Sequence, residues 1–457
     1  MRITHAIERA FRKYLPSPFT IAVLLTLISI ILAWAFTENT SSRGHLEAIL
    51  TYWEAGIWNR GLIVFAYQMM LILVLGHVLV LSKPMERLIL RLTSLVSTPA
   101  NAALFVALPT MLISFFNWGL GLIFGAILAR KVGEYAREKQ IAINYPLVGA
   151  AGYTGLMVWH GGISGSAPIK VSESGHIKDL MANSATADTL AMLPDNISTA
   201  YTVFSSWNIG LFLLVVLLVS LLIYRLGKRL KPTGIALPAY SFGKDKGNPE
   251  GAERLDRSKI LSVTFGILIL LAFVIQYTPM LRSLNINPDM LNFFMLGLAL
   301  VLHGSFHGFL RAVEEAIGDT AGILIQFPLY FGIMGIMGSS GMIAGISDFF
   351  VSVSNTTTFP VFTFFSAALV NIFVPSGGGQ WAIQGPMVLE SALQLNVPLP
   401  KAVMAMAYGD QITNMLQPFW ALPLLGITKL KAREILPYTL MFMLVGMLVF
   451  ISGLLLF

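Results

Sequence analysis

The amino-acid sequence predicts an all-α polytopic membrane protein. Of its 457 residues, 56% are hydrophobic and 12% are charged, whereas soluble domains carry about 25% charged residues. The apolar runs mostly reach the roughly 20 residues that a spanning helix needs, and they lack the period-2 alternation of outer-membrane strands. The expected uninterrupted spans cover residues 19–37, 61–82, 206–224, 260–279, 290–303, 320–346 and 437–457.

Polar and turn-forming residues interrupt other apolar segments in a pattern that occurs twice. Breaks lie at 117–121 and 152–155 in the first half, and at 375–380 and 408–414 in the second. Within each half the two breaks are about 35 residues apart. A repeated pair of broken segments is typical of secondary transporters, whose substrate sites lie near mid-membrane where the breaks meet.

The distribution of basic residues predicts the topology. With a cytoplasmic N-terminus, 24 of the 30 Lys and Arg residues fall in predicted inner segments, as the positive-inside rule requires. The same count leaves both ends of 99–131 inside and both ends of 359–397 outside. Each arm of the first has about 15 residues, or roughly 22 Å of helix, which is too short for a hydrocarbon core of ~30 Å. Both segments are therefore predicted to be re-entrant hairpins that enter from opposite faces.

These segments predict two inverted-topology repeats with about nine spans plus two hairpins. The first repeat covers 1–224, with hairpin 99–131 and broken helix 145–165. The second covers 290–457, with hairpin 359–397 and broken helix 400–426. Residues 225–289 form the cytoplasmic linker and a connecting helix that returns the chain to the outer face.

The breaks predict a binding site for an anion. Helices that begin at the hairpin tips present backbone N–H groups and the positive end of a dipole, and a run of glycines lets a ligand approach the backbone. The predicted substrate-binding residues are Asn117, Trp118, Gly119, Thr154, His160, Ser376, Gly377, Gly378, Gly379, Gln380, Thr413 and Asn414. Glycines in membrane helices also serve close packing, which is the interpretation we favour for Gly332, Gly335 and Gly338.

Asp410 is predicted to couple transport to an ion, because ionisable residues inside a membrane are costly and usually functional. It could bind a cation, carry a proton or orient Thr413 and Asn414. A Na⁺ site near Asn117, Ser376 and Asp410 and a proton on Asp410 both remain open. No cofactor is expected beyond Na⁺ or H⁺.

Other function classes find no support in the sequence. It contains no cysteine, no metal-spaced His/Glu pair and no phosphate-binding loop, so neither an enzyme nor an ATP-driven pump is expected. The net charge of +7 follows the predicted membrane topology, so no nucleic-acid partner is expected. The predicted partners are the lipid bilayer and a small carboxylate.

Five stretches resemble the bacterial short-chain fatty acid transporter family and together extend over most of the chain. They are RKYLPSPF at 12–19, FFNWG at 115–119, VWHGGISGSAP at 158–168, VPSGGGQW at 374–381 and YGDQITNMLQPFW at 408–420. The resemblance implies uptake of small monocarboxylates such as butyrate or acetoacetate across the bacterial inner membrane. Through the wider ion transporter superfamily, it also implies a homodimer that works by an elevator motion.

Two alternatives stay open from the residues alone. A C4-dicarboxylate or other organic-anion carrier could use the same neutral amide site. An anion channel would bind its ion more weakly and would show no coupling to a cation.

Overall fold

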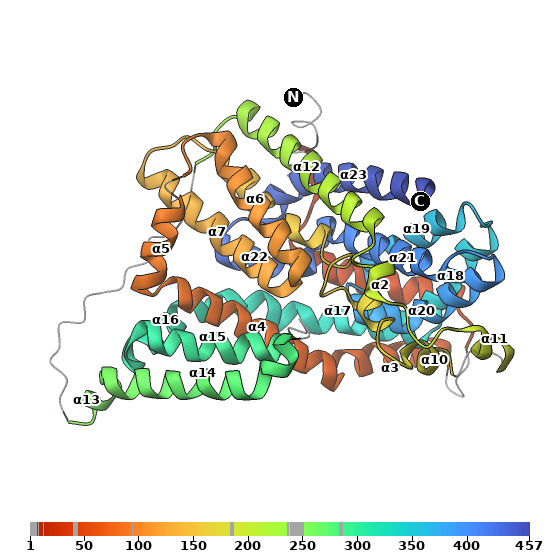
Figure 1. Cartoon of the computed structure of the whole chain (residues 1–457), viewed down its shortest axis with the longest axis horizontal. Helices are drawn as coiled ribbons and strands as arrows, with labels where there is room; N and C mark the ends of the chain where they lie inside the picture. Colours follow the sequence, from red (N-terminus) through yellow and green to blue (C-terminus); the bar gives the residue numbers. More distant parts are fainter. Residues whose placement is uncertain are drawn as a thin grey trace.

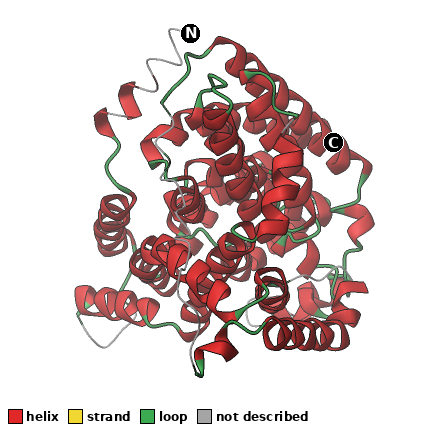
Figure 2. Cartoon of the chain, turned by 90° about the vertical axis from the view of Figure 1, so that its left-hand side faces the viewer, coloured by secondary structure: helices red, strands yellow, loops and turns green. Residues whose placement is uncertain are grey.

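The computed structural model describes residues 7, 9–11, 13–39, 44–93, 95–182, 187–234, 237, 251–282 and 287–457. Across these residues the chain is helical, and no strand occurs among them (Figure 2). Seven of the described helical segments are long and apolar enough to cross a membrane. These observations confirm the predicted all-α, multi-span class.

One group of helices, here called the peripheral group, packs around α4 and α17. Figure 1 shows α4, α14, α15 and α16 lying against one another along one side of the molecule. The group consists of α2 (Pro18–Phe36), α3 (His45–Ile57), α4 (Arg60–Val80), α14 (Lys259–Arg282), α15 (Pro288–His303), α16 (Phe306–Ile317) and α17 (Ala321–Ser339).

The remaining long helices form the core group, which contains every predicted break. Its first-half members are α6 (Pro99–Phe116), α7 (Trp118–Glu138), α8 (Tyr145–Ala151), η1 (Thr154–Met157) and α12 (Ser206–Arg229). Its second-half members are α19 (Phe359–Phe373), α20 (Gly377–Gln394), α21 (Leu399–Thr413), η4 (Asn414–Leu416), α22 (Pro418–Thr428) and α23 (Ala432–Leu456). Shorter elements connect them: α5 (Lys83–Thr93), α9 (Ser166–Lys170), α10 (His176–Met181), α11 (Ala187–Met192), η2 (Thr199–Tyr201), α13 (Glu253–Asp256), η3 (Gly318–Thr320) and α18 (Met342–Ser352).

Local chemistry explains where the helices break. Asn117 ends α6 with extended backbone angles and caps α7, because its Oδ1 accepts the N–H of Leu120 at 2.9 Å. Ser376 caps α20 in the same way through its Oγ and the N–H of Gly379. Such polar N-caps satisfy amides that no helix carbonyl can reach. Helices α6 and α19 thus end at the breaks that the sequence indicated, and residues 152–153 separate α8 from η1. The fourth break was expected at 408–414 but lies later, because α21 continues to Thr413 and regular helix resumes only at Pro418. Entry of the two pairs from opposite faces and the inverted repeat stay predictions.

The second half departs from the expected boundaries at one span. Residues 320–346 were expected to form one helix, but α17 ends at Ser339 and α18 begins at Met342. Gly341 lies between them at a φ of 78°, a left-handed conformation that glycine adopts readily and that ends the helix. Residues 304–319 lie between two expected spans, and most of them form α16. Ser347, on α18, is buried, and its Oγ accepts a hydrogen bond from Nε2 of Gln384.

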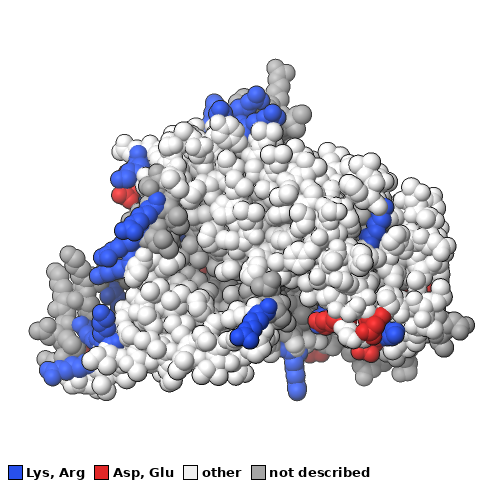
Figure 3. Space-filling view, in the orientation of Figure 1, with Lys and Arg blue, Asp and Glu red and all other residues white. Residues whose placement is uncertain are grey.

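Charge is sparse over the broad middle of the surface. In Figure 3 the Lys and Arg side chains gather mainly at the left-hand end and the upper edge, while most of the middle of this face is uncharged. Large apolar side chains are exposed on long helices, among them Trp34, Leu217 and Ile275. An exposed apolar surface of this extent is what a lipid-facing protein requires.

A buried ionic cluster joins the peripheral group to the core group. Asp319, at η3, accepts a hydrogen bond from Nδ1 of His77 on α4 at 2.9 Å. Its other carboxylate oxygen contacts Nζ of Lys429, which follows α22. The carboxyl side chain is only 1% exposed, so the nearby ammonium group compensates a charge that would otherwise be costly to bury.

Candidate functional site

The segment from Trp159 to Ser166 lies at the start of both α7 and α20. On the α7 side, the N–H of Trp118 donates to Oγ of Ser164 at 2.9 Å, and the N–H of Ile163 donates to the carbonyl of Phe115. On the α20 side, a Cβ placed on Gly377 would lie 2.8 Å from both the His160 and the Trp159 rings. The predicted tips at Asn117 and Ser376 therefore contact the same buried segment.

Gly377 is the position where the absence of a side chain matters most. A Cβ there would also lie 2.9 Å from Oδ2 of Asp410. These contacts are shorter than real Cβ contacts, so any larger residue would displace neighbours. At Gly378 a Cβ would meet only Oγ of Ser166, at 3.8 Å. Gly377 is thus a close approach of backbone to side chains, while the space beside Gly378 is open.

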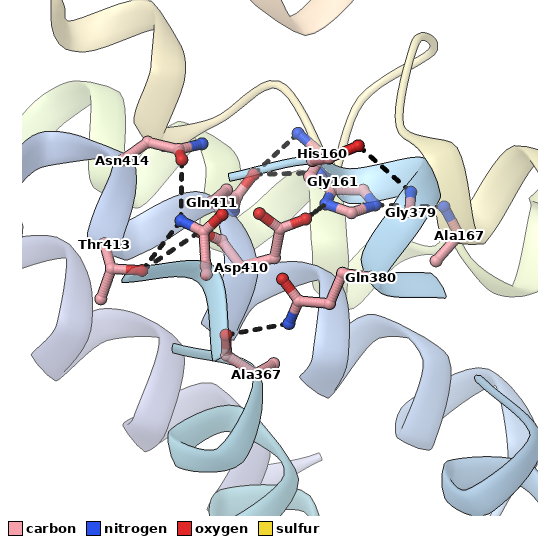
Figure 4. A network of polar contacts seen from close by, with 12 residues as sticks. His160, Gly161, Ala167, Ala367, Gly379, Gln380, Asp410, Gln411, Thr413 and Asn414 are labelled. Carbon is pink, nitrogen blue, oxygen red and sulfur yellow. Dashed lines mark hydrogen bonds and ion pairs between the residues drawn. The ribbon is translucent and has the colours of Figure 1, made fainter. Parts of the chain in front are cut away.

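Asp410 and His160 form a buried pair at the centre of the site (Figure 4). Oδ2 of Asp410, on α21, lies 2.6 Å from Nδ1 of His160, and the two side chains are 1% and 0% exposed. The contact has the distance of an ion pair but not the angle of a hydrogen bond. His160 was expected to bind substrate, yet both of its ring nitrogens face protein groups.

Hydrogen bonds to the surrounding backbone hold this pair in place. The N–H of Ala167 donates to Nε2 of His160 at 3.1 Å, which leaves the imidazole proton on Nδ1, facing Asp410. Oε1 of Gln411 accepts the N–H groups of both His160 and Gly161, at 2.9 and 3.1 Å. Because Gln411 and Asp410 are neighbours on α21, this helix positions the His160 segment directly.

The second break is organised by Asn371 of α19. Its Nδ2 donates to the carbonyl of Asp410, to Oγ1 of Thr413 and to Oδ1 of Asn414, over 2.8–3.0 Å. Nε2 of Gln417 donates in turn to the carbonyls of Asn371 and Ile372. Thr413 and Asn414, both expected at the substrate, are therefore held by α19, and Figure 4 shows the contacts that these two residues make.

Other predicted residues hold the frame of the site. Nε2 of Gln380 donates to the carbonyl of Ala367 and to Gln384, and Thr154 donates to the carbonyl of Ala151. The side chains of Asn117 and Ser376 cap their helices, and the amide of Trp118 bonds to Ser164. Gly119 is buried, and a Cβ placed there would make an ordinary van der Waals contact with Oδ1 of Asn117 at 3.6 Å.

Aromatic rings stand beside the first tip. The ring of Trp118 lies 5.0 Å from that of Trp420 and 6.0 Å from that of Trp159, between centroids. Phe65 of α4 lies 6.3 Å from Trp118 and 6.0 Å from Trp420. Such a wall suits a short alkyl chain, because apolar surface contributes to binding roughly in proportion to the area buried.

Within the site, Nε1 of Trp159 and Nδ2 of Asn414 are buried donors without a hydrogen-bond partner among the described residues. The first-turn amides of α20 at Gly377 and Gly378 add further N–H groups that no helix carbonyl can reach. Unpaired buried donors are costly unless a ligand or water satisfies them.

A metal site receives limited support from these residues. No group of three or more His, Asp or Glu side chains that could hold a metal occurs in the described part of the chain. Oxygens of Asn117 and Ser376, expected near a Na⁺ ion, are already used as helix caps. Among the described residues of the site, Asp410 is the one that carries a carboxylate.

The sequence did not single out Gln411, Asn371 or Asn208. Nδ2 of Asn208 donates to the carbonyl of Gly161, and its Oδ1 accepts from the hydroxyl of Tyr408 at 2.6 Å. The only sequence signal for such a residue is an amide side chain within an apolar helix, and that pattern also occurs where helices simply pack together. Only the three-dimensional arrangement separates a residue that supports the site from one that joins two helices.

Fold and site together define a helical membrane protein with a buried polar centre among broken helices. The chain belongs to the short-chain fatty acid transporter family, whose model matches residues 1–457. It is 36% identical to a protein of Escherichia coli (strain K12) named "Putative short-chain fatty acid transporter", over all of this chain and 99% of that one. A protein of the same name from Haemophilus influenzae is also 36% identical, over 99% of each chain.

Two solved transporters resemble the fold more distantly. The Alcanivorax borkumensis YdaH transporter is 16% identical, with a TM-score of 0.40, over 96% of this chain and 98% of its own. Neisseria gonorrhoeae MtrF, described with a class of antimetabolite efflux pumps, is 13% identical, with a TM-score of 0.39, over 97% and 96%.

Proposed function

We propose that the protein is a cation-coupled secondary transporter that takes up short-chain monocarboxylates such as butyrate or acetoacetate. The observation that carries the proposal is the meeting of two helix N-termini, α7 and α20, on the buried Trp159–Ser166 segment beside Asp410. Helix N-termini favour a negatively charged ligand. Membership of the short-chain fatty acid transporter family supports the substrate class.

The binding geometry we propose has two parts. The carboxylate lies beside Gly378, where the first-turn amides of α20 and Nε1 of Trp159 donate to it. The alkyl chain lies against the aromatic wall of Trp118, Trp159 and Trp420. One anionic site beside apolar rings favours a monocarboxylate over a C4-dicarboxylate, because burying a second carboxylate without a partner would be costly.

The membrane arrangement is part of the same proposal. The protein lies in the bacterial inner membrane with a cytoplasmic N-terminus, and the α6–α7 and α19–α20 pairs are re-entrant hairpins of two inverted repeats. The core group moves against the peripheral group in an elevator motion, within a homodimer. The division into two helix groups, joined by the Asp319 cluster, supports this mode.

Concentrative uptake by the purified protein in proteoliposomes tests the proposal. Labelled butyrate should accumulate when a Na⁺ or a proton gradient is imposed, and an excess of unlabelled acetoacetate should compete better than succinate. Protein-free liposomes must be subtracted, because undissociated butyric acid crosses bilayers by itself. Equilibration without accumulation would indicate an anion channel, and preference for succinate would indicate a dicarboxylate carrier.

A further inference from the structure

We propose that the coupling ion is a proton carried by Asp410, with His160 as a positioning residue that stays neutral throughout the cycle. This inference rests on the proposed function and adds to it the identity of the ion and the atom that carries it. The carboxylate of Asp410 binds the proton on Oδ1, while Oδ2 stays beside Nδ1 of His160.

The hydrogen bond from Ala167 prevents His160 from taking the proton. Nε2 of the imidazole accepts the N–H of Ala167, so its one proton is on Nδ1. An imidazolium ion would carry a second N–H on Nε2, directed at the Ala167 N–H. That state would lose a buried hydrogen bond and set two donors against each other. The next proton to enter the pair therefore binds the carboxyl group.

Asp410 also lacks the cation that a permanently ionised buried acid requires. Asp319 is equally buried, but Lys429 and His77 both contact it. Asp410 has only the neutral His160 within ion-pair distance among the described residues. Oδ1 of Asp410 is buried and has no hydrogen-bond partner in that part of the chain. Protonation of this oxygen removes an uncompensated charge.

The substrate and the ionised Asp410 compete for the same helix N-terminus. Oδ2 of Asp410 lies 2.9 Å from the Cβ position of Gly377, in the first turn of α20. Gly378 itself is exposed, but the Asp410 side chain is buried, so a carboxylate bound beside Gly378 would face this negative charge with little solvent around the Asp410 carboxylate to screen it. Protonation of Asp410 removes this repulsion. By linkage, the proton strengthens substrate binding and the substrate strengthens proton binding equally.

Among the described residues of the elements packed against α21, no other charged group is placed to take over this role. The elements packed against α21 are α9, α19, α20, α23, η1 and η4. Lys170 of α9 is half exposed and pairs with Glu173, and Glu434 of α23 binds the N–H of Lys431 at the start of that helix. The other titratable side chains on α21 and these elements are Glu390, Lys401, Tyr408, Arg433 and Tyr438. The hydroxyl of Tyr408 donates to Asn208, and α19 carries no titratable residue.

The transport step balances in charge. One carboxylate anion and one proton enter together from one side and leave together on the other. With a monocarboxylate the step moves no net charge, so a membrane potential alone should not drive it. Na⁺ coupling is the competing outcome, in which the ion replaces the proton at Asp410.

Calorimetric titration of butyrate into the purified protein tests the proton directly. Titrations at one pH in buffers of different ionisation enthalpy give the number of protons taken up with each butyrate. We expect an uptake that approaches one proton at high pH, where the apparent Kd should rise about tenfold per pH unit. Asp410→Asn, which imitates the protonated acid, should bind butyrate with no proton uptake and a Kd independent of pH.

His160→Gln separates the two members of the pair. The glutamine Oε1 can still accept the N–H of Ala167, and the carboxyl group of Asp410 stays in place. We expect the pH dependence of the Kd to persist in this variant, because the group that takes up the proton is unchanged. If His160 carried the proton, this variant would lose its pH dependence, and the proposal would be wrong.

Butyrate binding to the wild-type protein also distinguishes proton coupling from Na⁺ coupling. Butyrate binding that takes up no proton between pH 5 and 9, or that requires Na⁺, overturns proton coupling while leaving carboxylate transport intact. Absence of both butyrate binding and butyrate transport would instead overturn the proposed function.

Discussion

In the proposed site, Trp159 is the aromatic side chain that we expect to bind the substrate most directly, because its buried Nε1 has no partner among the described residues. Trp159→Phe keeps the apolar ring and removes this one donor. The KM for butyrate should rise roughly 10- to 100-fold, since a hydrogen bond to a charged group contributes about 1.5–3 kcal/mol. Initial uptake rates in proteoliposomes at matched protein density measure the change.

Trp381 provides the matched control for this substitution. It is a buried tryptophan of α20, but its Nε1 already donates to Nε2 of His176 at 3.1 Å. Burial and the nearby Lys170 lower the pKa of His176, so its ring stays neutral and able to accept. Trp381→Phe should leave the KM within about twofold of wild type. Equal KM increases in the two variants would remove Trp159 from the binding site.

At the level of single residues, the sequence indicated which positions belong to the candidate site but not which contacts each side chain makes there. Asp410 and the glycines after Ser376 were found because charge and flexible backbone are unexpected in hydrocarbon. The pairing of His160 with Asp410 could not be predicted, since 250 residues separate them along the chain. Gln411 and Asn371 were missed for the same reason: Gln411 binds the distant turn segment at His160, and Asn371 binds Asn414 beyond the end of α21.

The start of α20 yields a sharp comparison of neighbouring glycines. Gly377→Ala would place a methyl group within 3 Å of His160, Trp159 and Asp410. Overpacking of this kind costs about 1–3 kcal/mol, so the melting temperature of the detergent-purified protein should fall and transport should be impaired. Gly378→Ala meets open space and should melt as wild type does. Equal melting temperatures for the two variants would contradict the close approach at Gly377.

The elements themselves were largely readable from the sequence. Breaks at Asn117 and Ser376 follow from local capping chemistry, and the glycine packing expected on α17 is present where Gly335 approaches the backbone of Tyr52 and Gly56. The α17–α18 boundary and α16 were missed. An apolar run indicates burial but not where a single left-handed glycine ends a helix, and α16 is amphipathic rather than uniformly apolar.

At the scale of the whole molecule, the inverted topology can be tested because the chain contains no cysteine. Single cysteines at Lys139, after α7, and at Thr357, before α19, lie at exposed positions. A membrane-impermeant thiol reagent should label Thr357→Cys in intact cells and Lys139→Cys only in inside-out vesicles. Labelling of both positions from the same side would contradict the inverted repeats.

The most direct test of a substrate site at the helix tips is protection of a single thiol by substrate. In Gly378→Cys the new side chain would project into the open space where we place the carboxylate. Saturating butyrate should slow its reaction with a small thiol reagent by at least about tenfold, as expected when a bound ligand occupies the space beside the thiol. Labelling of Thr357→Cys should be unchanged. If butyrate slows the reaction at neither position while transport persists, the substrate binds elsewhere and the site at the α20 N-terminus is wrong.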